Sequence, residues 1–166
     1  MPRPKSQPQL RREVVAHLED LPRQLLALET AMEKFGENFE LSKFKPAFEG
    51  EAGSEAYNQV QAVERGFARV QNYIAQLAQN GATLAGLEIP KIHESEAARA
   101  FEALREAGAI EASLCKRLKR LQKARAAVEH EYLQVKAGPL HQAVGLLVAS
   151  ARDFVGPYAT WVKPYL

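Results

Sequence analysis

Three side chains in the last third of the chain, Arg125, His130 and Tyr132, have the types and spacing of a site that acts on phosphates. Arginine keeps its charge at any working pH, and its planar fork of donors suits phosphoryl oxygens. Histidine titrates near neutrality, so His130 is able to accept or deliver a proton. Because a motif this short also arises by chance, the surrounding elements have to support its interpretation.

This set of side chains matches the needs of phosphoryl transfer without a metal ion. Such a transfer requires a base for the proton of the attacking hydroxyl, a cation for the charge that develops on phosphorus, and a proton for the leaving oxygen. His130 suits the first or the third role, and the flanking Glu129 and Glu131 favour its charged form. Arg125 suits the second role, because its donors meet two phosphoryl oxygens at once.

Helix geometry restricts how these side chains meet. At about 100° per residue, the five-residue step from Arg125 to His130 turns the two side chains roughly 140° apart on an intact helix. Either the helix ends near His130 and the chain turns, or the arginine of one subunit works beside the histidine of another. Tyr132 returns to the face of Arg125 about 10 Å further along the helix.

The approach to the motif is basic, with no acidic residue between Glu111 and Glu129. Such a run is usually a solvated helix face. Its position one to two turns before the motif also suits the steering of RNA phosphates. Both interpretations stay open for its basic side chains, which besides Arg125 are Lys116, Arg117, Lys119, Arg120 and Lys123.

Length and composition predict one domain with a single core, since 166 residues with 46% hydrophobic content need neither disulfides nor metal. The lone Cys115 fits a reducing compartment, and no apolar run approaches the roughly 18 residues that cross a bilayer. We therefore expect a cytoplasmic protein without a membrane span. No glycine-rich phosphate loop and no metal-ligand spacing occurs, so neither a cofactor nor a metal is expected.

The first half of the chain predicts two long helices. Residues 1–9, rich in proline and basic residues, are expected to form a disordered tail, with the single domain over 10–166. Apolar residues at alternating spacings of four and three then predict a helix kinked at Pro22 and ended by Gly36. Residues 37–53 suggest a connecting loop with one short turn. A second helix is expected to follow until Gly81 and Gly86 break its apolar pattern; its stripe is Val60, Val63, Phe67, Val70, Ile74 and Leu77.

The second half predicts three more helices. A shorter one begins at Ser95 and ends at Gly108. The next has an apolar stripe of Leu114, Leu118 and Leu121, which Arg125, Val128 and Tyr132 continue. The last follows residues 138–139, and Gly-Pro at 156–157 is a possible early end. With no strand alternation, the expected fold is an all-α, up-and-down bundle of about five helices.

Taken together, these features resemble the HEPN superfamily, and within it the HepT-like toxins of the HepT/MntA toxin–antitoxin systems. The resemblance covers most of the chain. It rests first on the motif at Arg125, His130 and Tyr132. It also includes the run Ala-Val-Glu-Arg at 62–65, the helix from Phe101 that ends before residues 108–110, and the leucine-rich approach over 114–121.

The resemblance implies a metal-independent endoribonuclease that works as a homodimer, with two copies of the motif lining a cleft at the subunit interface. Arg125 and His130 would be its catalytic residues. The implied partner is an MntA-type minimal nucleotidyltransferase antitoxin, as in a type VII-like pair. This partner would silence the toxin by adding AMP to Tyr132, placing charge and bulk beside Arg125.

Two other functions remain open. The position after the arginine is usually polar in this family, most often asparagine, and here it is Ala126. This departure favours a catalytically inactive HEPN module that serves as the binding or substrate subunit of the nucleotidyltransferase. In the third hypothesis the chain is a helical interaction protein, and Arg125 and Tyr132 are a structural pair satisfied by neighbours such as Glu64.

Overall fold

The structure is a computed structural model that describes residues 4–130 and 136–166, without the side chains of 126–130. The described residues form helices only, which confirms the all-α prediction for them. They contain six α-helices rather than about five, followed by a short 3-10 helix. The elements are α1 (Gln7–Glu33), α2 (Leu41–Phe48), α3 (Glu55–Leu84), α4 (Glu96–Glu106), α5 (Ala112–His130), α6 (Ala137–Val162) and η1 (Lys163–Tyr165).

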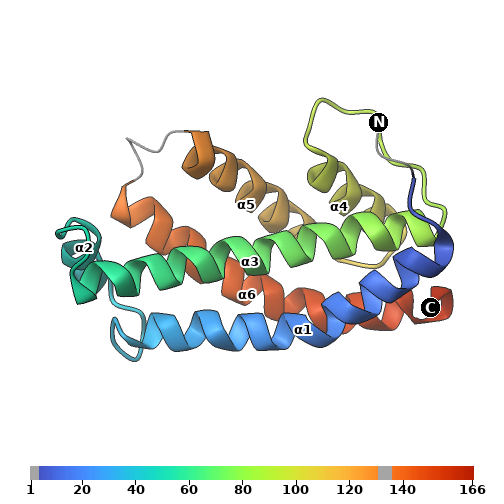
Figure 1. The fold of residues 1–166 in the computed structure, drawn as a ribbon. Coiled ribbons are helices and arrows are strands. Elements are labelled where there is room, and N and C mark those ends of the chain that lie inside the picture. The colour runs from blue at the N-terminus through green and yellow to red at the C-terminus, as the bar shows by residue number, and fades with distance from the viewer. Residues whose placement is uncertain (1–3, 131–135) are drawn as a thin grey trace.

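The long helices α1, α3 and α6 lie side by side and form the body of a bundle (Figure 1). Helices α4 and α5 cover one side of this body, where α4 packs on α3 and α5 packs on α4 and α6. The short α2 closes one end against α3 and α6. Helices α3 and α5 run in opposite directions, so the C-terminal end of α5 lies toward the beginning of α3 (Figure 1).

Helix α2 corrects the expectation of a loop over residues 37–53. Its Phe44 is fully buried, and the ring centroid lies 5.2 Å from that of Phe35 in an edge-on arrangement. Phe39 joins the same cluster and stacks on His141 of α6. The aromatic residues that looked scattered in the sequence therefore belong to one packed cluster, and its burial stabilises a short helix despite the glycines and the proline nearby.

Helix α1 begins before the predicted position. The side chain of Ser6 caps it by accepting a hydrogen bond from the backbone N–H of Gln9, so the helix starts at Gln7 rather than near residue 10. Pro8 is tolerated because the first turn has no intrahelical acceptor for its missing N–H. The helix continues through Pro22 and bends along its length, as predicted (Figure 1).

Two other helices pass glycine and proline positions that were expected to end them. Helix α3 includes Gly81 and ends near Gly86, whose φ of +66° is unfavourable for other residues. Helix α6 continues through Pro157, because Tyr158 and Val162 extend its buried face beyond the proline. Packing energy from the core outweighs the local helix-breaking tendency at these positions.

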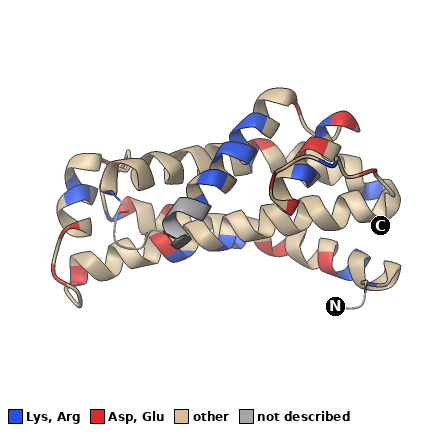
Figure 2. Cartoon of the chain, turned by 90° about the horizontal axis from the view of Figure 1, so that it is seen from above, with Lys and Arg blue, Asp and Glu red and all other residues tan. Residues whose placement is uncertain are grey.

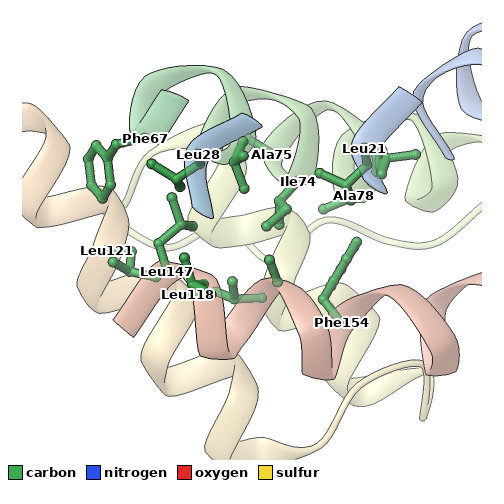
Figure 3. Close-up of a cluster of buried hydrophobic side chains, with 14 of the residues drawn as sticks. Leu21, Leu28, Phe67, Ile74, Ala75, Ala78, Leu118, Leu121, Leu147 and Phe154 are labelled. Atoms are coloured by element: carbon green, nitrogen blue, oxygen red, sulfur yellow. The ribbon is translucent and has the colours of Figure 1, made fainter. Parts of the chain in front are cut away.

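The predicted apolar stripes meet in one core (Figure 3). Each of the helices α1, α3, α5 and α6 contributes side chains that are almost completely buried. Among the described residues, the stripe residues of α3 and the leucines of the α5 stripe therefore face the interior. Those labelled in the core are Leu21 and Leu28 of α1, Phe67 and Ile74 of α3, Leu118 and Leu121 of α5, and Leu147 and Phe154 of α6.

Gly81 allows α3 to approach the buried Tyr158 of α6. The phenol hydroxyl of Tyr158 donates a hydrogen bond to the carbonyl of Leu77, and a Cβ on Gly81 would lie 2.3 Å from that hydroxyl oxygen. We expect Gly81→Ala to lower the free energy of unfolding by about 1–3 kcal/mol through overpacking. Urea denaturation measures the change.

Gly145→Ala is the matched control, since a Cβ on this helical glycine of α6 has no atom within 4 Å. There the better helix propensity of alanine should raise stability by up to about 1 kcal/mol. Equal stability of Gly81→Ala and the natural sequence would contradict the close approach of the two helices.

Candidate functional site

Arg125 lies where the buried stripe of α5 reaches the C-terminal part of the helix. Leu114, Leu118 and Leu121 of this stripe are 4%, 2% and 1% exposed, and Arg125 follows at the next position and is half-buried. The prediction that an arginine takes an apolar stripe position is confirmed. Arg125 takes part in an interaction at this position.

A buried hydrogen bond joins α3 to the turn of α5 that carries Arg125. The side-chain nitrogen Nε2 of Gln71 donates to the carbonyl oxygen of Leu121 at 2.7 Å. Leu121 is four residues before Arg125, so its carbonyl belongs to the turn that leads into Arg125. Sequence analysis missed Gln71, although an amide beside Val70 on an otherwise apolar helix face was the signal that could have found it.

The motif follows the path of α5, which is helical through His130. Backbone positions 125 and 130 are therefore about 140° apart around the helix axis. Tyr132 lies outside the described residues, as do the side chains of His130 and Ala126. Within one chain, the backbone register directs positions 125 and 130 toward different sides of α5.

Glu64 of α3 is the neighbour considered as a structural partner of Arg125. Its carboxyl is half-buried, and burial raises its pKa above the ordinary value. Because the proposed pair includes Tyr132, which lies outside the described residues, the structural pair stays a prediction.

Two of the five predicted phosphate-steering residues are engaged in ion pairs. The guanidinium of Arg117 lies 2.7 Å from a carboxylate oxygen of Asp153 on α6. The ammonium of Lys119 lies 2.9 Å from Glu94 and 3.6 Å from Glu102 on α4. These two cations hold α5 against its neighbours, so their charge is largely compensated.

The other three, Lys116, Arg120 and Lys123, are exposed on one side of α5. No acidic side chain within the described ranges forms an ion pair with them. Together with residues of α4 they line a groove of about 510 Å³. Basic residues follow one another along α5 in the view from above (Figure 2).

Cys115 lies at this groove, but its thiol is buried and hydrogen-bonded. Its thiol donates a hydrogen bond to the carboxylate of Glu102, with a distance of 3.4 Å from Sγ to Oε2. Burial and this bond raise the pKa of Cys115 to about 12. A thiol in this state is a poor nucleophile.

We expect Cys115 of the folded protein to resist alkylation. Because its pKa rises from an ordinary value of 9.0 to about 12, the thiolate fraction at pH 8 falls about a thousandfold. Mass spectrometry of an iodoacetamide time course should show slow labelling of folded protein and rapid labelling in urea. Equal labelling rates in the two conditions would contradict the buried, protonated thiol.

The aromatic residues near the C-terminus pack in the bundle rather than forming a platform for bases. Tyr158 is fully buried and stacks on Phe154 with centroids 4.8 Å apart. Trp161 is half-buried, with its ring centroid 5.9 Å from that of Tyr158. These aromatic side chains therefore contribute to packing within the chain.

The part of the chain that the structure covers contains no cluster of three or more His, Cys, Asp or Glu side chains able to hold a metal ion. Over the same residues, none of the helices has the length and apolar character to span a membrane.

No protein-family model matches the chain, and neither does any curated protein or solved structure that was compared with it. The described residues form an all-helical bundle. Because no match assigns a function, the assignment depends on the residues of the candidate site.

Proposed function

We propose that this protein is a metal-independent endoribonuclease of the HEPN type, acting as a homodimer and as the toxin of a type VII-like toxin–antitoxin pair. Its catalytic residues would be Arg125 and His130. The antitoxin would be an MntA-type nucleotidyltransferase that transfers AMP to Tyr132. The proposal extends the resemblance of the motif and its flanking helices to this family.

The observation that best supports it is the placement of Arg125. Arg125 places a half-buried cation at the end of an otherwise buried leucine stripe, where partial burial strengthens its attraction for negative charge. The bond from Gln71 to Leu121 adds rigidity to the preceding turn. A cation at such a position suits the stabilisation of charge on a phosphoryl group.

The chemistry assigned to the site is transphosphorylation. His130 takes the proton from the 2′-hydroxyl, and the 2′-oxygen forms a bond to phosphorus while the bond from phosphorus to the 5′-oxygen breaks. The same histidine, protonated in this transfer, then supplies the proton to the leaving 5′-oxygen. Arg125 binds the phosphoryl oxygens as negative charge develops on them. The products are a 2′,3′-cyclic phosphate and a 5′-hydroxyl.

Helix geometry is the reason for proposing a dimer. Since α5 is helical through His130, positions 125 and 130 of one chain are directed to different sides. Two copies related by a two-fold axis would bring the arginine of one chain beside the histidine of the other.

Cleavage of a labelled RNA in excess EDTA tests the proposed activity. We expect the purified protein to cut RNA at an undiminished rate, since no step uses a metal ion. A requirement for Mg²⁺ or Mn²⁺, or no cleavage of any RNA by protein free of its partner, would contradict the proposal.

A second candidate function is supported by Ala126. If a polar side chain after the arginine is needed to orient the substrate, the chain would be an inactive module that binds the nucleotidyltransferase. Mass spectrometry after incubation with that enzyme and ATP separates the candidates. An inactive module predicts AMP on Tyr132 without RNA cleavage before modification, whereas an accidental motif predicts neither.

A further inference from the structure

We infer that the exposed side of α5 binds single-stranded RNA through a track of three cations, Lys116, Arg120 and Lys123, called here the α5 track. The inference rests on the proposed function, because it assigns the path by which RNA reaches that site. It also divides the predicted steering residues into two groups with different roles.

The spacing of the α5 track suits a polymer of regularly repeated charges. The steps of four and three residues keep the side chains within about 60° around the helix, and they advance about 6 Å and then about 4.5 Å along it. Successive phosphates of a single strand are separated by a comparable distance. Three cations spaced along one side of a helix therefore suit the binding of a phosphodiester backbone better than the binding of a single compact anion.

Charge compensation distinguishes the α5 track from its neighbours. The acidic side chains of the adjacent groove, Glu94 and Glu102, form ion pairs with Lys119, and Glu102 also pairs with Arg105. Their negative charge is consequently engaged within the protein. The cations of the track keep their full charge toward solvent, where it is available to phosphates.

The direction of the α5 track leads to the proposed motif. Backbone position 130 falls on the same side of α5 as the three cations, about 10 Å beyond Lys123. A strand that lies along the track would therefore be guided toward the C-terminal end of the helix. The groove of about 510 Å³ between α4 and α5 favours a single strand, since a recessed basic groove follows one backbone.

Binding of a short fluorescent RNA, measured by anisotropy at several salt concentrations, tests the inference. All variants carry His130→Ala, so that cleavage does not interfere. The test variant adds Lys116→Gln, Arg120→Gln and Lys123→Gln. The control adds Arg12→Gln in α1, Lys34→Gln at the end of α1 and Arg69→Gln in α3. These three cations are exposed, and their replacement gives the same net charge. Circular dichroism verifies that each variant is folded.

The test variant should bind weakly. The slope of log K against log salt should decrease in magnitude by about 2, because each of the three lost phosphate contacts contributes roughly 0.7 to it. The control should retain both affinity and slope. An equal loss in the control, an unchanged slope, no RNA binding by the parent protein, or preference for a duplex of the same length would overturn the α5 track.

This experiment also separates the inference from the proposed function. If RNA binds through the track but the natural protein never cuts it, the nuclease proposal fails and the track remains. If the natural protein cuts RNA while the test variant binds RNA as tightly as the control does, the track fails and the nuclease proposal remains.

Discussion

Replacement of His130 by alanine is expected to abolish RNA cleavage, with a loss of at least about 10²- to 10⁴-fold in single-turnover rate. The imidazole would serve as the base for the 2′-hydroxyl and, once protonated, as the acid for the 5′-oxygen. Its removal therefore eliminates both proton transfers from each composite site. A gel assay of labelled RNA under enzyme excess measures the rate.

His93→Ala is the matched control, because this histidine is exposed in the connection between α3 and α4. It should leave the rate unchanged. Undiminished cleavage by His130→Ala, or an equal loss in His93→Ala, would remove His130 from the mechanism.

Arg125→Ala is expected to reduce the rate by about 10²- to 10³-fold, as the loss of a donor to developing phosphoryl charge does. A larger effect, the recovery of activity, is expected when an Arg125→Ala chain is paired with a His130→Ala chain in one dimer. If each site takes its arginine from one subunit and its histidine from the other, the heterodimer keeps one intact site. With two affinity tags to isolate it, we expect about half of the natural rate from two inactive parents.

A second heterodimer gives the opposite expectation. One natural chain paired with a chain carrying both Arg125→Ala and His130→Ala has no intact composite site, so it should be inactive. If instead each chain built its own site, this heterodimer would be active and the first one inactive. That reversal would contradict the shared cleft.

The helices were predictable because their apolar stripes are regular. Val60 to Leu77 in α3 and Leu114 to Leu121 in α5 recur at helix spacing, and all of these stripe residues are buried. Helix ends were less predictable. Pro157 and Gly81 break helices by local propensity, yet tertiary packing carries α6 and α3 past them.

The candidate site, like the helices, was predictable only in part. The stripe position of Arg125 was visible in the sequence, since helical spacing alone defines it. Which basic residues remain uncompensated was not visible, because Asp153 and Glu94 are distant in sequence from Arg117 and Lys119 and meet them only in the folded chain. The contact of Gln71 with Leu121 depends on packing between α3 and α5 in the same way.

Analysis of the product ends tests metal-independent transphosphorylation of RNA most directly. RNA cut in EDTA should carry a 2′,3′-cyclic phosphate on one fragment and a 5′-hydroxyl on the other. A single 2′-deoxy nucleotide on the 5′ side of the scissile phosphate should prevent cleavage there. A 5′-phosphate product, or unchanged cleavage at the 2′-deoxy position, would contradict the account.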